Sequence, residues 1–88
     1  MEDLSRLRES IDALDERLVE LLSQRAELAV RAGRIKKAAG LDILDPARES
    51  EIIERLTKIS QGTILKDEIR NIFSAIIKAC RELQKHQT

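Results

Sequence analysis

The feature that most constrains the fold of this chain is an unbroken apolar repeat in its N-terminal part. From residue 4 onward the repeat alternates steps of three and four residues over five heptads. Its members are Leu4, Leu7, Ile11, Leu14, Leu18, Leu21, Arg25, Leu28, Ala32 and Ile35. No proline interrupts the repeat, and Gly40 provides a stop. The pattern predicts one helix of roughly 35 residues, about 50 Å long at about 1.5 Å per residue.

Two shorter helices are expected in the rest of the chain. The first runs from about residue 46 to 60, with Asp45 as N-cap, Pro46 as first helical residue and Gly62 beyond its end. The second runs from about residue 65 to 85, and its predicted apolar face consists of Ile69, Ile72, Phe73, Ile76, Cys80 and Leu83. We therefore predict an all-α fold of three helices, in a single domain that covers residues 1–88.

The length of the first helix predicts association with a second copy of the chain. Neither shorter helix is long enough to cover its apolar seam, and a small chain seldom leaves such a seam in water. A homodimer is the simplest arrangement that buries it.

Composition excludes several classes of partner. The 88 residues include 16 basic and 16 acidic side chains, so no net charge attracts nucleic acid or an anionic membrane. One cysteine cannot form an internal disulfide and fits a reducing compartment. No apolar run has the length of a membrane span or resembles a signal peptide. We expect a cytoplasmic protein with no nucleic-acid or membrane partner.

Cations interrupt the seam of the first helix. Arg25 occupies a seam position, and steps of four, seven and eleven residues from it reach Ala29, Ala32 and Lys36. Two cations separated by small side chains leave room for a ligand. Arg8 lies beside the seam but 17 residues from Arg25, roughly 25 Å along the axis. It could therefore reach a ligand held by Arg25 only from an antiparallel partner chain.

The second helix has a similar anomaly at its start. Extending its apolar stripe back by four residues from Ile52 and Ile53 reaches Arg48 and Glu49, where core residues would be expected. Asp45 is a cap first, and any contact with a ligand is additional.

Each of these polar residues also has a structural interpretation. Arg25 could pair with an acid on another helix, Lys36 could belong to the solvated face of "RAGRIKK", Arg48 and Glu49 could pair with other helices, and Cys80 could be a small core residue.

Their convergence favours a binding site. The sequence has no Ser/His/Asp set, metal-ligand cluster or Gly-rich phosphate loop, and His86 is a poor candidate because it lies near the chain end. We expect no metal or cofactor. The site suits a small ligand with two carboxylates and a hydroxyl, and a reaction that depends on positioning and fixed charge.

Three segments carry a resemblance to a known family. "LRESIDALDERLVELLSQRAELAVRAGRIK", "DPARESEIIERL" and "IFSAIIKACRELQ" resemble the all-helical chorismate mutases, and the likeness covers nearly the whole chain. The resemblance implies an intertwined antiparallel homodimer with two active sites, each completed by an arginine from the other chain's first helix. It also implies rearrangement of chorismate to prephenate, in phenylalanine and tyrosine biosynthesis, without a covalent intermediate.

The resemblance assigns the carboxylates and the ether oxygen of chorismate to specific residues. Arg25 and the partner's Arg8 look like the grips on the two carboxylates, with Arg48 assisting. Lys36 and Gln84 are similar to the pair that hydrogen-bonds the ether oxygen.

Three further positions follow from the same likeness. Glu49, with the backbone near Asp45, is similar to the contact with the ring hydroxyl. Cys80 lies in the site where a well-known member of the family has serine, which leaves a secondary contact open.

Two other functions remain alternatives at this point. An isochorismate-pyruvate lyase resembles the same fold with a similar cationic pocket, and a non-catalytic regulatory dimer would need the same helices. Members of the family are also found fused to other shikimate-pathway enzymes, so the chain could be one domain of a bifunctional protein.

Overall fold

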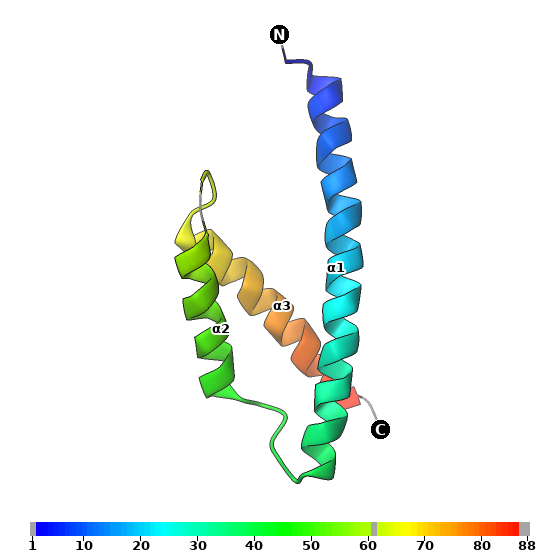
Figure 1. Cartoon of the computed structure of the whole chain (residues 1–88), viewed down its shortest axis with the longest axis vertical. Helices are drawn as coiled ribbons and strands as arrows, with labels where there is room; N and C mark the ends of the chain where they lie inside the picture. The colour runs from blue at the N-terminus through cyan, green and yellow to red at the C-terminus, as the bar shows by residue number, and fades with distance from the viewer. Residues whose placement is uncertain (1, 61, 87–88) are drawn as a thin grey trace.

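The structure is a computed structural model that describes residues 2–60 and 62–86. In these residues it consists of three α-helices without a strand: α1 (Leu4–Ala38), α2 (Pro46–Ile59) and α3 (Lys66–His86). Figure 1 shows α1 as a long rod, α3 crossing it diagonally and α2 alongside α3. The prediction of an all-α fold with one very long first helix is confirmed, and each helix boundary lies within one residue of its predicted position.

Both ends of α1 are closed by local hydrogen bonds. The Asp3 carboxylate accepts from the backbone N–H of Ser5 at 3.0 Å, which caps the N-terminus. At the C-terminus the N–H of Gly40 donates to the carbonyl of Lys37 at 3.2 Å, and that of Leu41 to the carbonyl of Lys36 at 2.8 Å. This pair of bonds requires a left-handed residue, and Gly40 supplies it with φ of 70°. The chain therefore turns away from α1 at Gly40, just after the helix ends at Ala38.

The two shorter helices begin with favourable residues. Asp45 caps α2, because its Oδ1 accepts from the backbone N–H of Arg48 at 3.1 Å, and Pro46 opens the first turn. The first turn of α3 contains Asp67 and Glu68, whose charges complement the positive end of the helix dipole.

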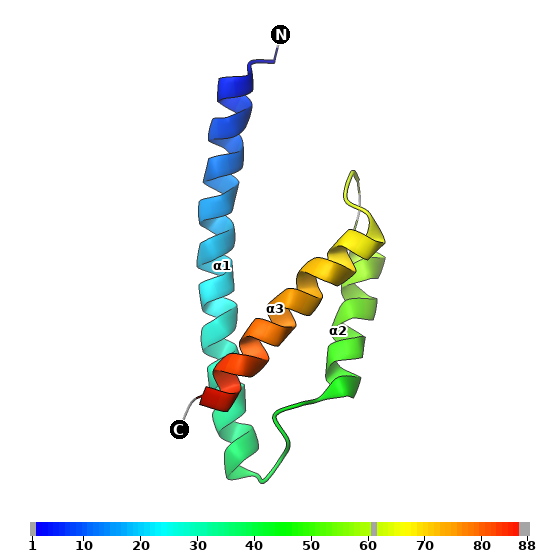
Figure 2. The same ribbon diagram turned by 180° about the vertical axis from the view of Figure 1, so that it is seen from behind.

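Helix α3 joins the other two helices. It packs against the C-terminal half of α1 and against α2, whereas α1 and α2 do not pack on each other within the described residues (Figure 2). Few residues are buried at these two contacts, and they are Gly33, Ile52, Thr57, Ile77, Cys80 and Gln84. On the predicted apolar face of α3, Cys80 is buried, whereas Ile72 and Leu83 are 47% and 39% exposed in the single chain; Ile77, which was not assigned to that face, is buried as well.

The apolar seam of α1 is uncovered in the single chain. Leu4 is 60% exposed, Leu18 54% and Ile35 69%, and the other leucines and isoleucines of the seam are exposed as well. The radius of gyration is 16.2 Å, whereas a compact domain of this size would have about 12 Å. Despite these exposed residues, none of the described helices combines the length and apolarity that a membrane span requires.

Candidate active site

A cavity of about 360 Å³ lies where the three helices meet the loop between α1 and α2. Its walls combine apolar side chains with four cations and two carboxylates. The lining residues are Arg25, Leu28, Ala29, Ala32, Lys36, Ile43, Asp45, Arg48, Glu49, Ile52, Ile77, Cys80, Arg81 and Gln84. Most of the buried residues of the chain therefore surround this cavity.

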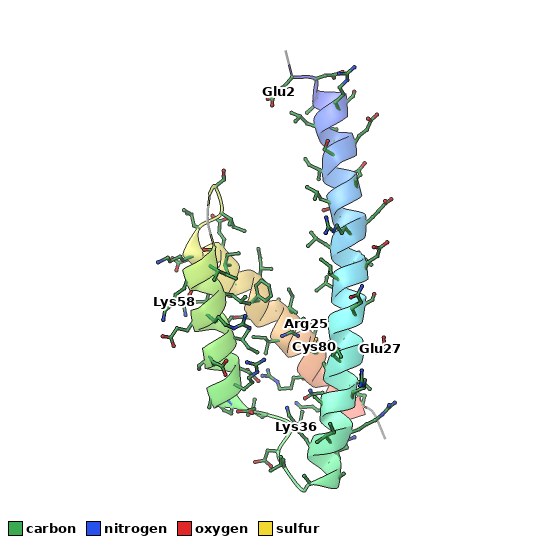
Figure 3. The ribbon with its side chains drawn as sticks, in the orientation of Figure 1. Glu2, Arg25, Glu27, Lys36, Lys58 and Cys80 are labelled. Atoms are coloured by element: carbon green, nitrogen blue, oxygen red, sulfur yellow. The ribbon has the colours of Figure 1, made fainter. Side chains whose placement is uncertain are left out.

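Arg25 crosses from α1 toward α3. Its Nη1 donates to the Sγ of Cys80 at 3.0 Å, and Figure 3 shows the two residues where the helices cross. Among the described residues no carboxylate pairs with Arg25, so the alternative of an interhelical ion pair is not supported. The half-buried guanidinium thus keeps most of its donors for other partners.

Lys36 and Gln84 form a hydrogen-bonded pair at the same wall. The half-buried ammonium of Lys36 donates to the carbonyl of Ile43 at 3.0 Å and to Oε1 of Gln84 at 3.3 Å. Nε2 of Gln84 donates to the carbonyl of Ala29 at 2.9 Å. An ammonium has three N–H donors and an amide has two. Within the part of the chain that the structure describes, one donor on each group therefore has no protein acceptor.

Lys36 is hydrogen-bonded to the loop after α1 through both its backbone and its side chain. Its backbone carbonyl accepts from Leu41, and its side chain reaches Ile43 in the same loop. Both ends of the residue are therefore fixed to the turn that Gly40 makes possible.

Gly33 determines how closely Gln84 approaches α1. A Cβ at residue 33 would lie 2.9 Å from Cγ of Gln84 and 3.3 Å from its Cα. Only glycine fits this contact without displacement. The sequence analysis missed this role, although a glycine inside a helix costs about 1 kcal/mol relative to alanine and so signals a packing requirement.

The first turn of α2 contributes the acidic part of the lining. Asp45 combines its cap with a place in the cavity wall. Arg48 lines the cavity but does not occupy a core position: its side chain is 53% exposed and pairs with Glu51 at 3.0 Å. Glu49 is half-buried, and both of its carboxylate oxygens accept from Nη1 of Arg81 at 2.8 Å.

Arg81 is a site residue that the sequence analysis missed. It lies on α3 in a set with Ile77, Cys80 and Gln84, at helical spacing, and all four line the cavity. This spacing is the signal that could have identified it.

Two residues considered from the sequence lie outside the cavity wall. Arg8 is exposed on the N-terminal half of α1, roughly 25 Å along the helix axis from Arg25. His86 is in the last turn of α3, 4.0 Å from Glu82. No group of three His, Cys, Asp or Glu side chains within residues 2–60 and 62–86 is arranged to hold a metal ion.

Comparison with known protein families identifies the family of this chain. Residues 7–85 match the family model described as chorismate mutase type II. The chain belongs to this family. A bifunctional chorismate mutase/prephenate dehydratase from Aquifex aeolicus is 40% identical, over 97% of this chain and 25% of that protein. A chorismate mutase from Methanocaldococcus jannaschii is 33% identical, over 97% of this chain and 87% of that protein. The chain thus spans about a quarter of the bifunctional relatives' length.

Solved structures from the family have the same fold. The form II structure of Thermus thermophilus chorismate mutase superposes with a TM-score of 0.95 at 34% identity, covering 98% of both chains. Helicobacter pylori chorismate mutase, solved in complex with prephenate, gives a TM-score of 0.88 at 32% identity, over 96% of this chain and 91% of that one.

Proposed function

We propose that this chain is a chorismate mutase, which rearranges chorismate to prephenate in phenylalanine and tyrosine biosynthesis. The observation that carries the proposal is the adjacent pair of donors on Lys36 and Gln84, each with one N–H without a protein acceptor in the described residues, in a cavity rich in cations. The family membership supports it, as does the similarity to a Helicobacter pylori enzyme whose structure contains prephenate.

The reaction needs no nucleophile or base. A C–O ether bond breaks as a C–C bond forms within one molecule, so the enzyme must hold a flexible substrate in a compact, chair-like shape. Negative charge develops on the ether oxygen as the bond breaks. Donors from Lys36 and Gln84 would stabilise that oxygen more in the transition state than in the substrate. Their bonds to Ile43 and Ala29 fix both donors before the substrate arrives.

The carboxylates of chorismate require cations. We assign one to Arg25, with Arg48 assisting from the rim, and the other to the partner's Arg8. Arg25 suits this role because its bond to Cys80 orients the guanidinium without neutralising it. The ring hydroxyl is assigned to Glu49 and to the backbone near Asp45.

The role of Arg8 requires an intertwined antiparallel homodimer. The exposed seam of α1 and the large radius of gyration support this assembly, because a second α1 would cover the seam. In an antiparallel arrangement the start of one α1 passes the far half of the other, which brings the partner's Arg8 near Arg25.

We also propose that residues 1–88 form one mutase domain that acts in the cytoplasm. Its match to most of the Methanocaldococcus jannaschii chorismate mutase supports an independent unit. Its match to a quarter of bifunctional relatives leaves open a fusion to, or association with, another shikimate-pathway enzyme.

The activity is tested by incubating the purified protein with chorismate and identifying the product. We expect prephenate from the wild type, almost none from Arg25→Ala, and normal turnover from Arg34→Ala, which removes an exposed arginine from the same helix. If chorismate is untouched, isochorismate is offered next. Pyruvate release would identify a lyase, and inertness toward both compounds would indicate a binding or structural dimer.

Mixing two inactive variants tests the shared site. A heterodimer of Arg8→Ala and Arg25→Ala chains contains one intact site if Arg8 acts in the partner, and none if it acts in its own chain. After subunit exchange an equal mixture should therefore recover about a quarter of wild-type turnover. A mixture that stays inactive, although an affinity tag on one variant co-purifies the other, would refute the shared site.

A further inference from the structure

Arg81 has no role in the chemistry described above, although it forms an ion pair with Glu49, which is assigned to the ring hydroxyl. Both side chains are largely shielded from water, with exposed fractions of 27% for Glu49 and 22% for Arg81. A single nitrogen of Arg81 donates to both oxygens of Glu49 at 2.8 Å. The other ion pairs between described residues are more exposed: the side chains of Lys58 and Glu54 are 72% and 71% exposed, and those of Lys85 and Glu82 are 51% and 46% exposed. Among the ion pairs between described residues, the Glu49–Arg81 pair is therefore the best shielded from water, and it links α2 to α3.

The pair also has a distinctive location. Glu49 and Arg81 line the cationic cavity, and they also line a second cavity of about 680 Å³ between α2 and α3. The two side chains thus lie at the boundary between the two cavities. From this position Arg81 binds the Glu49 carboxylate while it still lines the cationic cavity.

A carboxylate in the wall of the cationic cavity repels an anionic ligand. Glu49 is one of only two acids in the lining, and a substrate with two carboxylates would be repelled by it if it were unpaired. The other acid, Asp45, has its carboxylate engaged as the helix cap. Glu49 also has three rotatable side-chain bonds, so without a partner its oxygens would have no fixed position.

We propose that Arg81 is a positioning residue: it fixes the Glu49 carboxylate at the cavity wall and offsets its charge, so that a dianionic substrate can bind beside it. This inference rests on the proposed function and adds a residue to it. Arg81 acts through Glu49, and its loss should affect substrate binding more than the rearrangement itself.

The test compares steady-state kinetics of the wild type, Arg81→Met, Glu49→Gln and the double variant, with far-UV circular dichroism to confirm folding. Arg81→Met should raise KM for chorismate about tenfold, because an unpaired carboxylate then faces the substrate. Arg81→Lys, which keeps the charge, should stay close to the wild type. Arg70→Met is the matched control. Arg70 is an exposed cation on the same helix, and it lines the second cavity but not the first.

The decisive comparison is the double variant. Replacing Glu49 by glutamine in the Arg81→Met background removes the repelling charge, so KM should fall back to the value of Glu49→Gln alone. A purely structural pair would not give this rescue in folded protein. Arg81→Gln, whose amide can still hydrogen-bond the carboxylate, gives the same comparison if Arg81→Met does not fold.

The outcomes separate the two proposals. If the wild type is active, two results would overturn the role of Arg81 and leave the proposed function intact. One is a KM of Arg81→Met equal to that of the wild type, and the other is a KM of the double variant above that of Glu49→Gln. A wild type that leaves chorismate unconverted would overturn the proposed function and this inference with it.

Discussion

Replacing Gly33 with alanine tests whether the close approach of α3 to α1 sets the geometry of the site. The new Cβ would lie 2.9 Å from Cγ, 3.0 Å from Cβ and 3.3 Å from Cα of Gln84, where an ordinary contact begins at 3.4 Å. The last of these atoms belongs to the backbone, so rotating the Gln84 side chain cannot relieve the whole overlap. Helix α3 must move away from α1 by about half an ångström.

The expected change in stability is small because two effects oppose each other. Alanine gains about 1 kcal/mol over glycine inside a helix, and overpacking costs about 1–3 kcal/mol. The free energy of unfolding should therefore fall by about 0–2 kcal/mol.

The expected change in activity is larger. Gln84 carries the bond to Lys36 and the bond to Ala29, so moving α3 displaces a donor from the ether oxygen. A misplacement of about 1 Å can cost about a hundredfold in rate, so half an ångström corresponds to about tenfold.

Two measurements separate these effects. Urea unfolding is followed by far-UV circular dichroism, since the chain has no tryptophan or tyrosine for a fluorescence signal. All variants are compared at one protein concentration, because the stability of a dimer depends on concentration. Turnover is measured at saturating chorismate. Ser23→Ala is the control, because it raises helix propensity at an exposed position of α1. A Gly33→Ala protein with wild-type turnover would refute the reasoning, whatever its stability.

Other substitutions test the remaining roles. Lys36→Ala should raise the barrier by about 2.7–4 kcal/mol if its ammonium acts as an oxyanion donor, and a near-normal kcat would contradict that role. Gln84→Glu should give turnover that falls as pH rises, because only a protonated carboxyl can donate to the ether oxygen; a flat pH profile would refute this reason. Cys80→Ser should keep kcat/KM within a few-fold, since a hydroxyl oxygen still accepts from Arg25, whereas Cys80→Val should lower it clearly; equal values for the two would show that the bond is unimportant.

Cations placed in an apolar seam could be identified from the sequence because a charge at such a position requires a partner. Arg25 was found in this way, Lys36 was found eleven residues further along the same helix, and the structure brings both to one cavity. Arg81 was not found, since a cation beside an apolar stripe of α3 does not conflict with a solvated helix face. Its pairing with Glu49 depends on how α2 and α3 are placed, across 32 positions of sequence.

The sequence by itself determined the three helices and their ends. Heptad spacing, the caps at Asp3 and Asp45 and the glycine after α1 act over a few residues, so the local chain contains all the information they require. Only the tertiary structure decided which faces meet. The contact of Gly33 with Gln84, the choice of Ile77 over Leu83 as a buried residue and the pairing of Glu49 with Arg81 all depend on the angle at which α3 crosses its neighbours. That angle is set by packing between distant segments, which no local pattern encodes.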